Sequence, residues 1–281
     1  MTRRHLITTA AVASPALLAA SRLAAQTSSA PVAPEGLQRV ELTLDGVSRE
    51  ALVYAPSTAK SKPTPLVFAF HGHGGTARNA VHSFAMNQHW PEAISVYMQG
   101  LPTAGRLVDR EGKFPGWQGR PGDEGDRDLK FFDAMLTKLK ADYQVAPSQI
   151  FSTGHSNGGG FTYLLWLTRG ETFAALAPSS AAAPGMGAQM KHVKPKPVMH
   201  IAGEADKLVK FEWQKELMEA IRQLNECEPE GKPWDQWSTL YPSKTGNRFI
   251  SVIHPGGHTF PTEVPRLITK FFKEQVALAK V

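Results

Sequence analysis

Three side chains in the second half of the sequence have the types and the chain order needed for nucleophilic catalysis. Ser156 lies in the segment Gly154-His155-Ser156-Asn157-Gly158, which fits the pattern Gly-x-Ser-x-Gly. A serine hydroxyl is a weak nucleophile until a base removes its proton, and the base is usually a histidine that is oriented by a carboxylate. The sequence therefore predicts Ser156 as a nucleophile, followed along the chain by an acid and then by a histidine.

Four histidines follow Ser156, and one of them has a suitable place for the base. His258 lies in the Gly-rich segment "IHPGGHTFP" after the last apolar run, where its ring can reach over the end of a sheet. His200 and His254 lie within apolar runs and are expected to be packed, and His192 lies in a Lys- and Pro-rich surface segment. We therefore predict His258 as the base.

The acid is expected in the loop "HIAGEADKLVKF", which offers Glu204 and Asp206. We favour Asp206 because it lies further along the loop, nearer to a position from which it could reach His258. Its alternative role is that of a helix N-cap for the following segment. Glu204 remains the alternative acid.

Backbone N–H groups that could stabilise an oxyanion are predicted at two places. The amide of Asn157 begins a helix directly after the nucleophile, and the Gly-rich run "FHGHGG" after an apolar strand offers the amide of His73. A competing interpretation takes the side chains of His71 and His73 as metal ligands. Because no carboxylate or third histidine lies nearby in the sequence, we predict no metal site.

The elements that must position these groups follow an α/β pattern. Two alternating runs joined at Asp45-Gly46 predict a β-hairpin. Amphipathic helices are predicted over 128–143 and 265–280. Apolar runs typical of buried parallel strands lie at 65–70, 93–98, 149–154, 173–178, 197–203 and 248–254. The pattern predicts a mostly parallel sheet of about eight strands with an N-terminal antiparallel hairpin and helices on both faces, with reacting groups at the carboxyl ends of the strands.

The chain is expected to contain one catalytic domain after two processing or spacer segments. Residues 1–25 have a basic start, an Ala-rich middle and small residues near Ala24, which predicts an export signal that also resembles a twin-arginine signal. A disordered terminus or an uncleaved amphipathic anchor is the alternative. Residues 26–37 are predicted to be a flexible linker, and residues 38–281 the catalytic domain.

Charge and cysteine content exclude several classes of protein. Removal of Arg3, Arg4 and Arg22 with the predicted signal lowers the formal net charge from +6 to +3, and no run of five basic residues is present, so we predict no nucleic-acid partner. The predicted signal is too short and too interrupted for a membrane span, and no stable membrane anchor is expected. A single cysteine, Cys227, forms no intrachain disulfide and no multi-thiolate metal site.

Five motifs, in this order, resemble those of the α/β-hydrolase esterases that group polyhydroxybutyrate depolymerases with feruloyl and acetylxylan esterases: "HGHGG", "GHSNGG", "FAALAPSS", "GEADKLV" and "GGHTFP". The resemblance runs from about Pro65 to Pro261. It implies a secreted carboxylic ester hydrolase without a metal or an organic cofactor. It also implies that Ser156 is the nucleophile, Asp206 the acid and His258 the base.

Two departures from the family pattern concern the substrate. The family often has a disulfide-bonded cysteine where this chain has His73, and a Trp where this chain has Phe260. We expect Phe260 to contact the substrate, although less strongly than a Trp. Trp117, in the insert 101–126, is expected to form an aromatic wall of the site, as are Trp234 and Trp237, or else to pack as structural residues.

The spacing 179–196 between two predicted strands leaves no room for a large cap domain, so the site is expected to be open. An open site favours bulky or polymer-attached esters, such as feruloyl or acetyl esters of polysaccharides or polyhydroxyalkanoates. A peptidase of the same fold and a catalytically silent binding module are the alternatives.

Overall fold

The computed structural model describes Met1 and residues 36–182, 186–190 and 193–278. The predicted export signal at 1–25 lies outside the described residues except for Met1, as does the predicted linker at 26–37 except for Gly36 and Leu37. His192 also lies outside them. None of the helices within the described ranges is long and apolar enough to span a bilayer.

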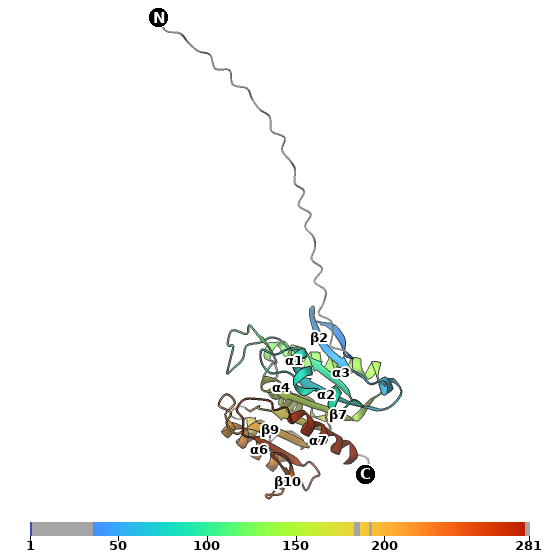
Figure 1. Cartoon of the computed structure of the whole chain (residues 1–281), viewed down its shortest axis with the longest axis vertical. Helices are drawn as coiled ribbons and strands as arrows, with labels where there is room; N and C mark the ends of the chain where they lie inside the picture. Colours follow the sequence, from blue (N-terminus) through green and yellow to red (C-terminus); the bar gives the residue numbers. More distant parts are fainter. Residues whose placement is uncertain (2–35, 183–185, 191–192, 279–281) are drawn as a thin grey trace. The chain divides into compact units, whose positions relative to one another are not determined.

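One twisted sheet of ten strands forms the centre of the domain, in the order β1-β2-β4-β3-β7-β8-β9-β12-β11-β10. The run from β4 to β12 is parallel, and the two strands at each edge pair in antiparallel fashion. Figure 1 shows β2 in blue and β10 in orange on opposite sides of this sheet. The strands are β1 (Gln38–Leu44), β2 (Val47–Tyr54), β3 (Thr64–Phe70), β4 (Ile94–Met98), β7 (Val145–His155), β8 (Ala175–Ser179), β9 (Val198–Gly203), β10 (Lys232–Asp235), β11 (Ser238–Tyr241) and β12 (Phe249–His254), and a separate pair is formed by β5 (Leu101–Pro102) and β6 (Pro115–Gly116).

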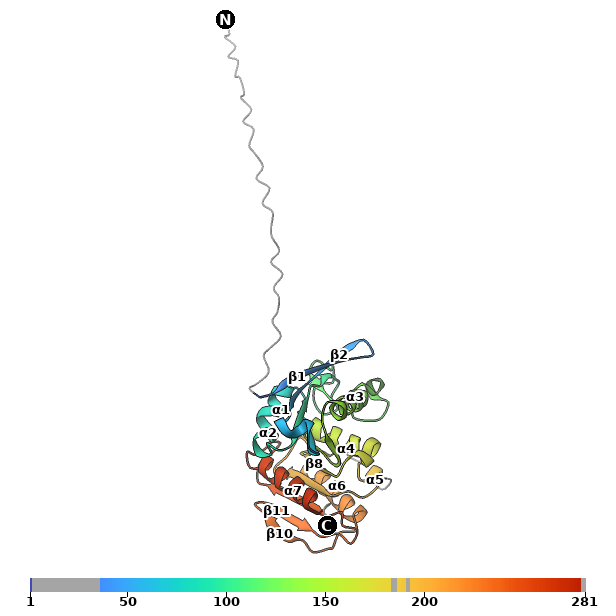
Figure 2. The ribbon, with the colours of Figure 1, turned by 90° about the vertical axis from the view of Figure 1, so that its right-hand side faces the viewer.

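Helices cover both faces of the sheet, as predicted (Figure 2). One face packs against α1 (Ala77–Phe84), α2 (Met86–His89) and α7 (Val264–Leu278), and the other against α3 (Arg127–Asp142), α4 (Asn157–Arg169), α5 (Met186–Met190) and α6 (Phe211–Leu224). Side chains alternate along β3: Phe68 packs on the α4 side and Val67 on the α7 side. Because both faces are buried, the central strands are continuous apolar runs instead of alternating ones.

The predicted elements are present, and the prediction of about eight strands is too low. The hairpin forms at Asp45 and Gly46, which both have positive φ values of 50° and 78°, as a two-residue primed turn requires. The segment around Trp234 and Trp237, which is not among the predicted strands, forms the edge hairpin β10–β11. Its strands are only four residues long and contain Pro233, so they carry too little alternation to be recognised.

A buried ion pair ties β2 to the start of α3. Arg49 Nη2 donates to Asp128 Oδ1 at 2.7 Å, and the two side chains are 2% and 0% exposed. The other carboxylate oxygen of Asp128 accepts the amide of Gln118 at 2.8 Å, which holds the end of the 101–126 insert. A charge in this position is stabilised only while its partner is present.

We predict that Asp128→Ala lowers the free energy of unfolding by about 3–5 kcal/mol, because it leaves the buried guanidinium of Arg49 without its counter-charge. Urea unfolding at pH 7 measures the change. The matched control is Asp133→Ala, which breaks an exposed ion pair with Arg169 and should cost no more than about 1 kcal/mol. Equal losses in the two variants would contradict the account of Asp128.

Candidate active site

Ser156 lies at a sharp turn between β7 and α4. Its φ and ψ angles are 55° and −120°, a region that non-glycine residues rarely occupy. The turn is tight because backbones approach closely on both sides: a Cβ at Gly154 would lie 2.2 Å from the carbonyl oxygen of Gly158, and a Cβ at Gly158 would lie 2.2 Å from that of Phe70. The two glycines of the motif are therefore required by contact, and they leave Ser156 at the tip of the turn.

The structure brings the three sequence-predicted residues into one hydrogen-bonded row. His258 Nε2 lies 2.8 Å from Ser156 Oγ, and His258 Nδ1 lies 2.8 Å from Asp206 Oδ2. Because a carboxylate only accepts, Nδ1–H donates to Asp206 and the lone pair of Nε2 faces the serine hydroxyl. This tautomer can take up the hydroxyl proton of Ser156. The three residues come from loops at the carboxyl ends of β7, β9 and β12.

Asp206, and not Glu204, faces the histidine. The side chain of Asp206 is fully buried. Its Oδ1 accepts the amides of Leu208 and Val209 at 3.0 Å each, so that the carboxylate also orders the loop before α6. Glu204 is exposed to solvent. Hydrogen bonds from the Leu208 and Val209 amides and from His258 Nδ1 hold the carboxylate in place against the His258 ring.

The other histidines near the sheet end are buried, as expected for packed residues. His200 and His254 are 0% and 1% exposed. Burial lowers the pKa of His200 to about 4 and also lowers the pKa of His254. His155, which precedes the nucleophile, has its pKa lowered to about 3 by burial, and its ring lies 5.1 Å from that of His258. At neutral pH these buried rings are uncharged neighbours of the row.

The two predicted oxyanion donors have free amides. Within the part of the chain that the structure describes, neither the N–H of His73 nor that of Asn157 donates to a protein acceptor. Asn157 is the first residue of α4, where the helix dipole favours negative charge. Both amides are thus available to an oxyanion next to Ser156.

The side chains of His71 and His73 make hydrogen bonds to neighbouring segments of the chain. His71 Nε2 accepts the amide of Gly100 at 3.0 Å, and burial lowers the pKa of His71 to about 4. His73 Nε2 lies 3.0 Å from Asp109 Oδ2. Among the described residues, no cluster of three or more His, Cys, Asp or Glu side chains is arranged to hold a metal ion.

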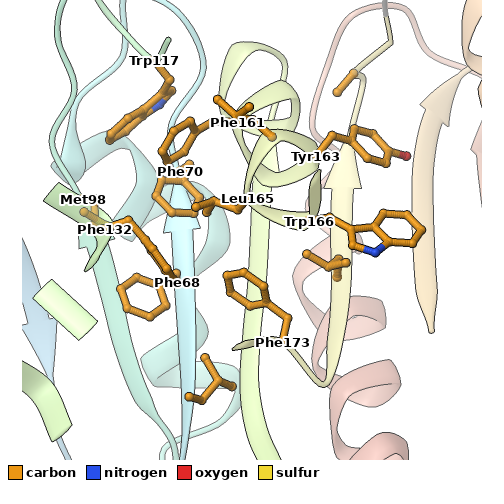
Figure 3. Packing of buried hydrophobic residues seen from close by; sticks show 14 of the residues in the cluster. Phe68, Phe70, Met98, Trp117, Phe132, Phe161, Tyr163, Leu165, Trp166 and Phe173 are labelled. Atoms are coloured by element: carbon orange, nitrogen blue, oxygen red, sulfur yellow. The ribbon is translucent and has the colours of Figure 1, made fainter. Parts of the chain in front are cut away.

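The prediction that Trp117 forms a wall of the site is wrong. Its side chain is 1% exposed and packs against Phe70 and Phe161 with both ring centroids 5.2 Å away (Figure 3). The indole N–H donates to the carbonyl of His71 at 2.9 Å. The backbone N–H and C=O of Trp117 both bond the side-chain amide of Asn157, at 2.7 and 3.0 Å. Trp117 therefore supports the loop that contains His71 and His73 from its buried side. Burial of the whole indole ring stabilises this arrangement more than exposure at the surface would.

Phe260 packs with the hydrophobic cluster on the α1 and α7 face of the sheet, whereas Trp117 belongs to the cluster on the opposite face. The ring of Phe260 is 5.6 Å from that of His155 and 4.7 Å from that of Phe84. These three residues, together with Gly72 and His73, line a cavity of about 120 Å³ next to the segment that precedes Ser156. Contact between Phe260 and a substrate stays a prediction.

Sequence reasoning missed two residues that the structure adds to the site. Gln214 in α6 donates to Asp206 Oδ2 at 3.2 Å, and Asp109 bonds the ring of His73. The first lies on the buried side of a helix and the second in an irregular insert, so no local pattern distinguishes either from an ordinary polar residue.

Comparison with known proteins finds similar esterases. No protein-family model matches the chain. The chain is 25% identical over 271 residues to a putative esterase, NocK, of Nocardia uniformis subsp. tsuyamanensis, a match that covers 82% of this chain and 76% of that protein. It is 27% identical over 216 residues to a probable feruloyl esterase C of Aspergillus flavus, covering 75% of this chain and 76% of that protein.

A solved structure of an acetyl xylan esterase from Aspergillus awamori superposes with a TM-score of 0.58 and 16% identity, over 84% of this chain and 98% of that one. The protein is an ester hydrolase with the α/β-hydrolase fold. The predicted fold and the predicted resemblance to esterases are confirmed. In the described residues between β8 and β9, this α/β hydrolase has only the short helix α5, in place of a large cap.

We predict that Asp206→Asn lowers kcat by about 10⁴, because an amide no longer stabilises the correct tautomer and the charge of His258. Glu204→Gln, the matched control in the same loop, should change kcat less than about twofold, since an exposed side chain has little effect. Steady-state kinetics on a soluble ester measures both. A greater loss in the Glu204 variant would make Glu204 the acid.

Proposed function

We propose that this ester hydrolase is exported and acts through a Ser156-His258-Asp206 triad on bulky or polymer-attached esters. The observation that carries the proposal is the unbroken row from Ser156 Oγ through the His258 ring to Asp206 Oδ2, with 2.8 Å at each step. Those are the contacts that a serine needs to lose its proton as it attacks.

The first half of the reaction forms an acyl-enzyme. Ser156 Oγ attacks the ester carbonyl carbon while His258 Nε2 takes the hydroxyl proton. The amides of His73 and Asn157 then stabilise the oxyanion, at about 3 kcal/mol for each donor. The tetrahedral intermediate collapses as His258 gives its proton to the leaving alcohol.

The second half releases the acid. Water enters in place of the alcohol, His258 Nε2 takes one of its protons, and the hydroxide attacks the acyl carbon. The same two amides stabilise the second oxyanion. Collapse returns the proton from His258 to Ser156 Oγ, and the carboxylic acid leaves.

The small size of the cavity next to the site supports the substrate class. The cavity of about 120 Å³ is smaller than the roughly 300–1,000 Å³ typical of pockets that enclose a whole ligand. Only a small part of an ester therefore enters beside Phe260, and the remainder lies on the open surface. Candidate substrates are the acetyl or feruloyl esters of polysaccharides, after the names of similar proteins, and polyhydroxyalkanoates.

Export is proposed from the sequence of residues 1–25. The assay below also tests the two alternatives from the sequence, a peptidase of the same fold and a catalytically silent binding module. The free amides beside Ser156 and the tautomer of His258 favour an active enzyme over the silent module.

A direct assay tests the proposal. The purified protein should hydrolyse p-nitrophenyl acetate and release acetate from acetylated xylan or ferulate from feruloylated arabinoxylan. It should leave an acyl p-nitroanilide and a peptide intact. Ser156→Ala should reduce ester turnover by about 10⁴ or more.

The matched control is Ser152→Ala, which removes a buried hydroxyl from the same strand and should retain kcat. Hydrolysis of amides at a rate similar to that of esters would favour the peptidase. Full activity in the Ser156 variant would reject the triad, and the absence of turnover on every polymer-attached ester would reject the substrate class.

A further inference from the structure

A buried chain of polar side chains lies behind the proposed catalytic acid. Gln214 Nε2 donates to Asp206 Oδ2 at 3.2 Å, and Gln214 Oε1 lies 3.1 Å from His200 Nε2. His200 Nδ1 lies 2.6 Å from the hydroxyl of Tyr163. Gln214 and His200 are 0% exposed and Tyr163 is 1% exposed, and the three come from α6, β9 and α4.

The direction of every hydrogen bond in this chain is determined. Gln214 Nε2 faces two acceptors, Asp206 Oδ2 and the carbonyl of Val209 at 2.7 Å, so the amide orientation is fixed. Gln214 Oε1 must then accept, and the group that it faces, His200 Nε2, must carry the hydrogen.

The far end of the chain fixes the histidine tautomer. Burial lowers the pKa of His200 to about 4, so at neutral pH the ring carries one hydrogen, which lies on Nε2. His200 Nδ1 therefore accepts from the hydroxyl of Tyr163. Burial also raises the pKa of Tyr163 well above its ordinary value, which keeps the proton on that hydroxyl.

We propose that these three residues are positioning residues for the acid of the triad. All donors in the chain point toward Asp206, so that the carboxylate receives a buried N–H on the oxygen that it shares with His258. Loss of the Tyr163 hydroxyl leaves His200 Nδ1 without a donor, which weakens the polarisation of the N–H groups that point along the chain to Asp206. The inference rests on the proposed role of Asp206.

The hydrogen-bonded side chains Gln214, His200 and Tyr163 have a predictable effect on the pH dependence of turnover. The titratable groups that face His258 are Asp206 and His155, with His254 beyond them. His155, with a pKa lowered to about 3, does not titrate near neutral pH. Because the Gln214 N–H offsets part of the negative charge on Asp206, its removal stabilises the protonated ring of His258. The rise of kcat/KM with pH should therefore move to higher pH.

The experiment compares Gln214→Met and Tyr163→Phe with the wild-type full chain. Gln214→Met should lower kcat about tenfold and change KM by less than about twofold. A loss of this size is expected when a catalytic group is slightly misplaced. The midpoint of the rise in kcat/KM should move up by about half a pH unit. Tyr163→Phe should also lower kcat and raise the pH midpoint, but by smaller amounts.

Tyr97→Phe is the matched control. Tyr97 is 0% exposed and its hydroxyl bonds Asn87 at 2.8 Å, but it packs in the core on the other face of the sheet. The variant loses a buried tyrosine hydroxyl and the stability that belongs to it, and it should keep the wild-type kcat and pH midpoint. Thermal unfolding of all variants measures the structural cost separately.

Two results would overturn the inference. One is a Gln214→Met enzyme with the wild-type pH midpoint and a kcat equal to that of Tyr97→Phe. The other is a Tyr163→Phe enzyme whose kcat and pH midpoint equal those of the wild type. This second result decides the question if the Gln214 variant does not fold. NMR titration of the His258 ring is independent of turnover. A shifted midpoint in a protein without esterase activity would uphold the positioning chain and reject the proposed function.

Discussion

The close approach of helix α4 to the ends of β3 and β7 is the contact on which the site depends. No Cβ fits at Gly154 or Gly158, so the chain can pass from strand to helix only through a residue in an unfavourable conformation. Ser156 occupies that position, at a cost of about 1–3 kcal/mol. Its amide bonds the carbonyl of Ser179 at 2.8 Å and its carbonyl accepts the amide of Gly160 at 2.9 Å. The packing of α4 thus holds the hydroxyl clear of the backbone and leaves the amide of Asn157 free.

The polar contacts around this turn make the site a single rigid unit. Trp117 and the Asn157 side chain join the insert to the start of α4, and the Trp117 indole and the His71 ring hold the loop of His73. Neutral buried histidines suit such bracing because each ring donates at one nitrogen and accepts at the other. Of the imidazoles in the described parts of the chain, only that of His258 faces both a serine hydroxyl and a carboxylate. In the proposed reaction, proton transfer is therefore confined to this ring.

Local patterns were enough to predict most of the fold. Continuous apolar runs identified the central strands, and the flanking glycines identified the turn at Ser156. The local patterns also placed Asp206 and His258 after the correct strands. These two loops contain few side chains that could act as an acid or a base, so the choice was small. The edge hairpin β10–β11, the burial of Trp117 and the contact of Gln214 with Asp206 were not predictable. Each of these features depends on contacts between elements that are distant in the sequence. The sequence alone does not distinguish a buried Trp from an exposed one, or a Gln that contacts the acid from any other Gln in a helix.

The central claim is that Ser156 is made reactive by the row through His258 to Asp206. Its most direct test is reaction of the purified protein with a fluorophosphonate, followed by intact-mass measurement and peptide mapping. The account predicts one adduct per chain, on the peptide that contains Ser156, and no adduct in His258→Ala over the same time. An adduct on any other residue in an active preparation, or equally fast labelling of the His258 variant, would contradict it.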